Sequence, residues 1–137
     1  MDISDSIVIA AAGMRAQGAR LRVVTENLAN ADSAAKEPGG EPYRRKVITF
    51  RNEVDRATGL PLVRVGSIEP DTRTPFSMAL RPGHPGADAN GYVRMPNVES
   101  LIEVADAREA QRSYDANLGM IEQARAMITR TIDMLRG

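Results

Sequence analysis

The side chains that most often carry catalysis or hold metal ions are few in this chain. The single histidine, His84, lies between prolines in the segment PGHPG, and there is no cysteine. Zinc sites combine several histidine or cysteine ligands, and thiol chemistry needs a cysteine, so neither is expected. Paired carboxylates could serve as acid and base, but the candidates are scattered in polar surroundings: Asp71, Asp88, Asp106 and Asp115. We therefore expect no catalytic residue, no metal site, no cofactor and no enzymatic activity.

Basic residues cluster once, in the segment YRRK at residues 43–46. Such a cluster could hold phosphates, or it could be a solvated strand edge whose charges discourage edge pairing. Lysine plus arginine equals aspartate plus glutamate, at 18 each, so the chain has no general attraction to nucleic acid or anionic lipid. We therefore favour the strand edge or a protein partner, and expect no nucleic acid and no small-molecule substrate.

The amides in the segment TENLANAD, residues 25–32, form a second polar pattern. Asparagine commonly ends helices, which accounts for one of Asn27 and Asn30. Two amides on one face suggest hydrogen bonds to a neighbouring backbone or helix end, because an amide both donates and accepts.

The distribution of proline indicates which elements must position these residues. All 8 prolines lie between Pro38 and Pro96, and proline in a helix interior costs about 3 kcal/mol or more. The sequence therefore predicts a helix over residues 3–31, an irregular or β-rich insert, and a helix over residues 98–135. Asp2 or Ser4 is the expected cap of the first helix, and Asn97 is the expected N-cap of the second.

Both predicted helices carry an apolar stripe with a period near 3.5 residues, which is typical of coiled coils. Four residues spaced seven apart form the stripe of the first helix: Ile7, Met14, Leu21 and Leu28. The apolar members of the second stripe alternate three and four apart, with polar exceptions at Gln111 and Arg125: Val104, Ala107, Tyr114, Leu118, Ile121, Ile128, Ile132 and Leu135. These stripes are the predicted helix–helix assembly surfaces.

Four segments of the insert have the alternation or composition of strands: residues 43–54, 62–68, 76–80 and 91–95. The expected fold class is α+β, with long N- and C-terminal helices packed as a coiled coil around a small β-rich middle insert. The expected divisions are residues 1–31 and 98–137 for the helical core and 32–97 for the middle domain.

Apolar residues outside the stripes, such as Val8, Ile9, Met120, Met127 and Met134, point to partners beyond the helix pair. We therefore expect self-assembly or assembly with homologous chains. The alternative is a soluble helical-hairpin adaptor or export chaperone, although such a chaperone has no need for a proline-rich insert. The longest apolar run, residues 7–14, is far shorter than the ~20 residues of a membrane span. The acidic start MDISDS is unlike a secretory signal peptide, so export without a cleaved signal is expected.

These features together resemble the axial and rod proteins of the bacterial flagellum. The resemblance is carried by NLAN at the end of the first helix, PYRRKVITF after a glycine- and proline-rich connector, and PGHPGADANGYVRMPNV before the last helix. It covers nearly the whole chain. The segment ADSAAKEPGGEPYRR is longer than the TPGY-type turn of many axial proteins, which leaves the conformation of residues 31–42 open.

The resemblance implies a structural subunit of the proximal part of the basal-body rod, in a helical tube that crosses the periplasm, transmits torque from motor to hook and forms the wall of the export channel. It implies as partners other rod subunits, further copies of the chain, and the flagellar type III export apparatus. It also implies a group of inter-subunit or turn residues: Asn27, Asn30, Tyr43, Arg44, Arg45, Asn90, Gly91 and Tyr92.

Overall fold

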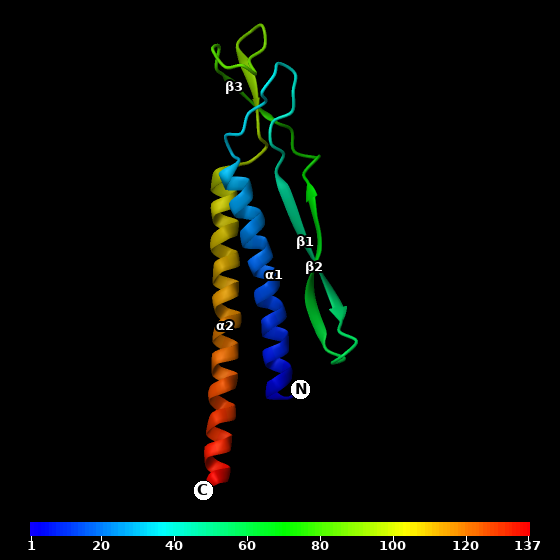
Figure 1. Ribbon diagram of the computed structural model, residues 1–137, viewed down its shortest axis with the longest axis vertical. Helices are drawn as coiled ribbons and strands as arrows, with labels where there is room; N and C mark the ends of the chain where they lie inside the picture. Colours follow the sequence, from blue (N-terminus) through cyan, green and yellow to red (C-terminus); the bar gives the residue numbers. More distant parts are fainter. The chain divides into compact units, whose positions relative to one another are not determined.

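The computed structural model describes residues 1–137 as two long helices and four strands (Figure 1). The order along the chain is α1 (Ile3–Ala29), β1 (Lys46–Val54), β2 (Pro61–Pro70), β3 (Ser77–Leu80), β4 (Tyr92–Met95) and α2 (Ser100–Arg136). β1 pairs with β2, and β3 pairs with β4, in two separate two-stranded sheets. The predicted α+β class, with terminal helices and a small β-rich middle, is confirmed. Neither helix is long and apolar enough to cross a membrane.

The residues form two compact units, each assembled from distant parts of the sequence. The first contains residues 1–21, 49–66 and 108–137. The second contains residues 22–48 and 67–107. Each therefore combines a part of α1, a part of α2 and a part of the insert.

A reciprocal cap starts α1 in the first unit. The backbone N–H of Asp5 donates to Oδ1 of Asp2 at 2.9 Å, and the N–H of Asp2 donates to Oδ2 of Asp5 at 3.0 Å. The first N–H groups of a helix have no acceptor within the helix, and this arrangement supplies one for each of these two. Of the two predicted caps, Asp2 is the one used.

Small residues line the contact between the helices in the first unit. A Cβ added to Gly13 would lie 2.7 Å from Nδ2 of Asn117, so the two helices approach closely at this point. The buried helix residues of this unit are all alanines: Ala10, Ala12, Ala16, Ala19, Ala110 and Ala124. Arg20 and Glu109 form an ion pair at 3.5 Å further along the same contact.

The contact does not use the predicted stripes as a buried seam. Ile7, Met14 and Leu21 are only partly buried, and Leu118 and Ile132 are 38% and 45% exposed. The physical reason is the small size of alanine and glycine, which brings the helix backbones close and leaves larger side chains at the edges of the contact.

The second sheet shows the two-faced pattern of a half-buried hairpin in the second unit. β3 and β4 are antiparallel, with Leu80 opposite Tyr92 and Ala79 opposite Val93. Val93 is buried on one face, whereas Leu80 and Tyr92 are exposed on the other. Beside the sheet, the Phe76 ring has the guanidinium groups of Arg44 and Arg94 at 4.3 Å and 4.9 Å from its centroid. Both distances are within the range of cation–π contacts.

The segment that the sequence left open is held by backbone hydrogen bonds. The N–H of Ala35 donates to the carbonyl of Arg94 at 3.1 Å, and the N–H of Tyr43 donates to the carbonyl of Ser33 at 3.0 Å. Gly86 passes so close that an added Cβ would lie 2.0 Å from the carbonyl oxygen of Ala35. Residues 33–43 therefore form a fixed connection against β4 and the loop before it.

Two local predictions are wrong. Asn97 does not cap α2: the N–H groups of Ile102 and Glu103 donate to the carbonyl of Glu99, and the Asn97 side chain bonds elsewhere. The first strand begins at Lys46 rather than at Tyr43, because the N–H of Arg45 donates to the side chain of Asn97. Both differences have one cause: the Asn97 side chain and the Arg45 backbone, 52 positions apart in the sequence, bond to each other.

Candidate functional site

Polar side chains from both helices and from the insert meet in the second unit. We call Asn27, Tyr43, Arg45, Lys46, Asn97 and Glu103 the polar junction. Asn27 comes from the last turns of α1 and Glu103 from the first turn of α2. Asn97 precedes α2, and the remaining members lie at the start of β1 or just before it.

Asn27 is at the centre of the polar junction and is 1% exposed. Its Oδ1 accepts hydrogen bonds from the Tyr43 hydroxyl at 2.8 Å and from the N–H of Lys46 at 2.9 Å. Its Nδ2 donates to the carbonyl of Lys46 at 2.9 Å and to Oε2 of Glu103 at 3.2 Å. An amide offers two donor hydrogens and an acceptor oxygen with two lone pairs, so all of its capacity is used within this chain.

Glu103, also 1% exposed, is neutralised by Arg45. Nε of Arg45 donates to Oε1 of Glu103, and its two terminal nitrogens lie 3.8 Å from Asp71 and 3.7 Å from Asp106. Burial lowers the pKa of Arg45, but the hydrogen bond and charge of Glu103 and the charges of both aspartates outweigh it and leave that pKa above its usual value. The guanidinium therefore remains charged, as a buried carboxylate requires.

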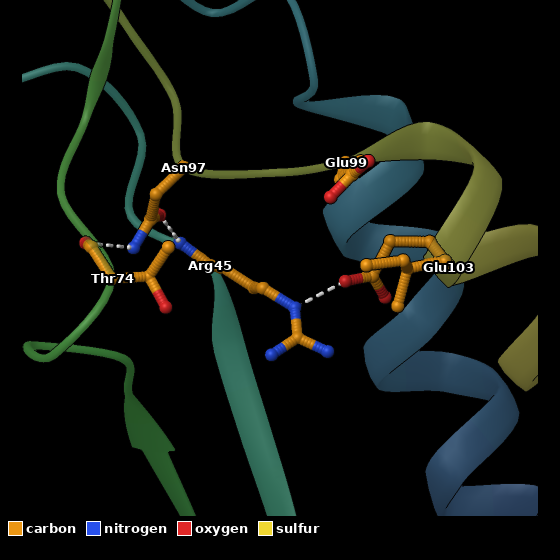
Figure 2. Close-up of a pocket in the computed structure, with 6 residues that line it drawn as sticks. Arg45, Thr74, Asn97, Glu99 and Glu103 are labelled. Atoms are coloured by element: carbon orange, nitrogen blue, oxygen red, sulfur yellow. Dashed lines mark hydrogen bonds and ion pairs between the residues drawn. The ribbon is translucent and has the colours of Figure 1, made fainter.

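Asn97 bonds to the backbone at three positions, of which Figure 2 shows those at Arg45 and Thr74. Its Oδ1 accepts from the N–H of Arg45 at 2.7 Å, and its Nδ2 donates to the carbonyls of Asp71 and Thr74, both at 3.0 Å. The hydroxyl of Thr74 donates to Asp71 at 2.7 Å, and this bond is the main cause of the lowered pKa of the Asp71 carboxyl. The turn at residues 71–74 is thereby fixed to the start of β1.

A small open cavity of about 120 Å³ adjoins the polar junction. It is lined by Arg45, Thr74, Asn97, Glu99, Ile102 and Glu103, all of which except Ile102 are labelled in Figure 2. Pockets for small ligands usually enclose about 300–1,000 Å³, so this cavity is smaller than that class of site. Arg45, Asn97 and Glu103 bond to one another or to nearby backbone, which makes the arrangement suited to fixing the chain.

The two asparagines, which the sequence analysis assigned to one face with a shared role, bond differently in the structure. Nδ2 of Asn30 donates to the carbonyl of Glu26 at 2.9 Å, and its Oδ1 accepts from the hydroxyl of Ser33 at 3.1 Å. Asn30 thus ends α1 locally, whereas Asn27 connects distant segments. Because the amide of Asn27 is fully used within the chain, it has no free donor or acceptor for a neighbouring subunit.

The other predicted inter-subunit and turn residues lie in two places. Tyr43 and Arg45 belong to the polar junction, and Arg44 donates from Nη1 to the carbonyl of Asp71 at 3.2 Å. Asn90, Gly91 and Tyr92 form a turn in which the Asp88 carboxylate accepts from the N–H groups of Asn90 and Tyr92, both at 2.9 Å. Gly91 has φ +82° there, in the left-handed region that favours glycine.

The predicted assembly residues of the helices range from partly buried to exposed. The partly buried members are Ile7, Met14, Leu21, Leu28, Tyr114, Ile121 and Ile128. Val104, Leu118, Ile132 and Leu135 are exposed. The structure thus places these last four where another chain could contact them, and their role in assembly stays a prediction.

Sequence reasoning missed Glu103 and Asn97 as members of the site. An acid in the first turn of a helix, as Glu103 is in α2, is sufficiently explained by the helix dipole, so its sequence position does not indicate a buried partner for a distant arginine. The burial of a single glutamate leaves no local sequence signature by which Glu103 could have been recognised.

His84 behaves as a loop residue: its Nδ1 accepts from the N–H of Gly86 at 2.9 Å. No group of three or more histidine, cysteine or acidic side chains is arranged to hold a metal ion.

Comparisons with known proteins give consistent results. Residues 89–134 match the family model described as the C-terminal region of flagellar basal body rod FlgEFG proteins. The chain is 49% identical to flagellar basal-body rod protein FlgC of Agrobacterium fabrum, over 98% of this chain and 96% of the relative. It is 41% identical to FlgC of Salmonella typhimurium over 92% of both chains, and 34% identical to FlgC of Borreliella burgdorferi over 100% of both.

Proposed function

Because this chain belongs to the FlgC family of flagellar basal-body rod proteins, we propose that it carries load in a helical tube that transmits torque from motor to hook. The chain is a structural subunit of the flagellar basal-body rod. The finer proposal is that its terminal parts, residues 1–31 and 98–137, pack as a coiled-coil core that forms part of the wall of the export channel. Residues 32–97 then form the outer, β-rich part.

The exposed apolar side chains of α2 support this proposal. Leu118 and Ile132 lie on one face of the helix, and Leu135 near its end is 83% exposed. Apolar surface of this extent on a helix marks a contact with another chain. Contacts between different surfaces of identical or homologous subunits build helical filaments when the rotation between subunits does not close a ring.

The polar junction has a supporting role in the proposal. It ties the end of α1, the start of α2 and the start of β1 through side chains that are almost fully buried. Such a tie keeps the end of α1, the start of α2 and the start of β1 in a fixed relation while neighbouring subunits bear on them. The proposed partners are other rod subunits, further copies of this chain and, during export without a cleaved signal, the type III apparatus. The adaptor or chaperone alternative is not favoured, since the relatives that match almost the whole chain are rod proteins.

The test uses point variants at exposed positions. Deleting residues 98–137 would also remove Glu103 and disrupt the polar junction, so a truncated chain could fail for lack of folding. The double variant Leu118→Ser/Ile132→Ser changes only exposed side chains and should leave the helix content of the purified monomer unchanged. We expect it to be exported but missing from detergent-washed basal bodies, with loss of swimming.

The matched control is Gln111→Ala/Thr129→Ala, at exposed polar positions on the same face of α2. This control should be incorporated and should support swimming. Normal swimming and normal incorporation of Leu118→Ser/Ile132→Ser would overturn the proposed role of this face.

A further inference from the structure

Asparagine followed by glycine occurs once in the chain, at Asn90–Gly91 in the segment DANGY. This pair of residues can react internally: the glycine nitrogen attacks the side-chain carbonyl carbon of the asparagine and closes a five-membered imide ring. Glycine hinders the attack least, because it has no Cβ beside its nitrogen. The reacting atoms belong to adjacent residues, so their encounter costs little entropy. The Asn90 side chain is exposed, which leaves its amide accessible to water.

In the folded chain the reacting nitrogen is held as a hydrogen-bond donor. The N–H of Gly91 donates to the carbonyl of Asp88 at 3.0 Å, and the Gly91 carbonyl accepts from the N–H of Arg81 at 2.8 Å. The attack requires the Gly91 nitrogen to lose its proton, and a proton that is already donated is harder to remove. Gly91 is also buried, and a Cβ added to it would lie 3.2 Å from the ring of Pro82. A base from solvent therefore reaches this nitrogen poorly.

The shape of the turn also keeps the reacting atoms apart. The hydrogen bond from residue 91 to residue 88 closes a β-turn with Asn90 at its third position. Asn90 has no positive φ, so the turn is of type I, in which the third residue has a ψ of about 0°. At that angle the backbone nitrogen of Asn90 eclipses the nitrogen of Gly91. Ring closure needs Cβ of Asn90 in that position instead, so the Cα–C bond must first rotate out of the turn.

The carboxylate of Asp88 locks this conformation. Its Oδ1 accepts from the N–H groups of Asn90 and Tyr92, both at 2.9 Å. The N–H of Asp88 donates in turn to the carbonyl of Tyr92 at 2.9 Å. Rotation about the Cα–C bond of Asn90 moves the following peptide and disrupts these bonds. The reaction therefore needs a local opening of the turn, and the Asp88 side chain limits how often the turn opens.

We infer that Asn90 is a modification site controlled by the fold: it converts to aspartate and isoaspartate while the chain is unfolded, and it is protected once the turn has formed. The Gly91 nitrogen, deprotonated by a base from solvent, bonds to Cγ of Asn90. The Cγ–Nδ2 bond breaks, and the leaving nitrogen takes up a proton and departs as ammonia. Water then adds to the imide and breaks one of its two carbonyl–nitrogen bonds. Cleavage at Cγ gives aspartate, and cleavage at the backbone carbonyl gives isoaspartate.

Isoaspartate changes the turn permanently. The backbone then runs through Cβ and Cγ, which adds one carbon atom between the nitrogens of residues 90 and 91. The Asp88 carboxylate accepts from N–H groups on both sides of this addition, and Leu80 pairs with Tyr92 just beyond it. The added atom is incompatible with that spacing, so a chain that stays unfolded for long acquires a damaged hairpin. The reaction depends on this turn alone and is independent of the proposed rod function.

Peptide mapping of the full chain by mass spectrometry tests the inference. One sample stays folded and another is unfolded in guanidinium chloride, at the same mildly alkaline pH and for the same time. We expect Asn90 to convert at least about tenfold more slowly in the folded sample, because only molecules with an open turn react. Asn52, exposed on β1 but followed by glutamate, is the internal reference and should stay unchanged in both samples. Equal rates at Asn90 in the two samples, or no conversion in the unfolded one, would overturn the assignment.

Two variants separate the hydrogen bonds of Asp88 from its charge. Asp88→Asn keeps an oxygen that accepts from both N–H groups and should protect Asn90 as the unsubstituted chain does. Asp88→Ala removes this acceptor, so conversion of Asn90 without denaturant should rise toward the rate in the unfolded chain. Circular dichroism checks that both variants keep their helix content. Conversion in folded Asp88→Ala as slow as in Asp88→Asn would refute the role of the carboxylate; if Asp88→Ala does not fold, the two samples of the unsubstituted chain still decide whether the fold protects Asn90.

Discussion

Asn27 and Glu103 lie 76 positions apart in the sequence and meet through a 3.2 Å hydrogen bond from Nδ2 to Oε2. One belongs to the end of α1 and the other to the start of α2, and both are almost completely buried. The bond is therefore a direct connection between the two terminal segments of the chain. Its strength depends on Arg45, which balances the carboxylate, and on the Lys46 backbone and the Tyr43 hydroxyl, which take up the other hydrogen bonds of the amide.

Replacing Asn27 with alanine should destabilise the monomer strongly. The change leaves the Tyr43 hydroxyl, both backbone groups of Lys46 and one oxygen of Glu103 without their partner. Each unsatisfied buried group costs about 1–3 kcal/mol, so we expect a loss of about 3 kcal/mol or more in the free energy of unfolding. Urea denaturation measures it. Asn30→Ala removes only local bonds and should cost about 1 kcal/mol; an equal effect of the two variants would contradict this account.

Arg45→Ala should cost about 3 kcal/mol, because removing one member of a buried ion pair leaves the other charge uncompensated. Arg45→Lys should recover only part of the loss, since an ammonium cannot span Glu103, Asp71 and Asp106 as a planar guanidinium does. The control is Arg51→Ala, which removes an exposed ion pair with Glu53 at 2.9 Å and should change stability by less than about 1 kcal/mol. Equal losses for Arg45→Ala and Arg51→Ala in denaturant titrations would refute the role assigned to Glu103.

Tyr43 should make stability sensitive to alkaline pH. Burial first, then the charges of Glu26 and Glu103, raise its pKa from 10.0 to about 12. The folded state therefore favours the neutral phenol, and the stability that Tyr43 contributes is complete below pH 10 and is lost as the pH rises from 10 to about 12. Absorbance at the phenolate band should show an ionisation near pH 12 that is absent from Tyr43→Phe. The same variant should lose less stability than the unsubstituted chain across this interval. Ionisation of all three tyrosines together near their ordinary pKa would contradict the prediction.

Gly86 should tolerate no side chain, although its neighbour in the same loop should. Alanine at position 86 would place Cβ 2.0 Å from the backbone oxygen of Ala35, which cannot move without breaking the connection to β4. Gly83 has no atom within 4 Å of an added Cβ and has no positive φ. Overpacking usually costs about 1–3 kcal/mol, so Gly86→Ala should lower the unfolding midpoint clearly while Gly83→Ala leaves it almost unchanged. The reverse order in thermal melts would show that this loop is not packed against residue 35.

The helices and strands were predictable because their signals are local. Proline positions marked the insert, and alternation or β-branched composition marked its strands near residues 46–54, 61–70, 77–80 and 92–95. The polar junction was not predictable in the same way. Asn97 and Glu103 each had an adequate local explanation, as an N-cap and as an acid near the positive end of a helix dipole. Both instead bond to Arg45, which is 52 positions from Asn97 and 58 positions from Glu103 in the sequence.

The packing of the helices was missed for a different reason. A heptad pattern is recognised by its large apolar residues, and these form the predicted seam. The contact instead uses Gly13 and alanines such as Ala16 and Ala124, which carry little hydrophobic signal individually. A seam of small residues is shifted around the helix from the stripe of large ones. Burial in the single chain and apolar periodicity therefore identify different faces of the helix as the contact.

The three hydrogen bonds of Asn97 have a mechanical consequence. A single amide attaches the peptide before α2 to the backbone at Arg45, Asp71 and Thr74. Moving the start of α2 away from the insert therefore strains three hydrogen bonds to the backbone together. Under the load proposed for the rod, these three bonds would act together against shear at the base of α2.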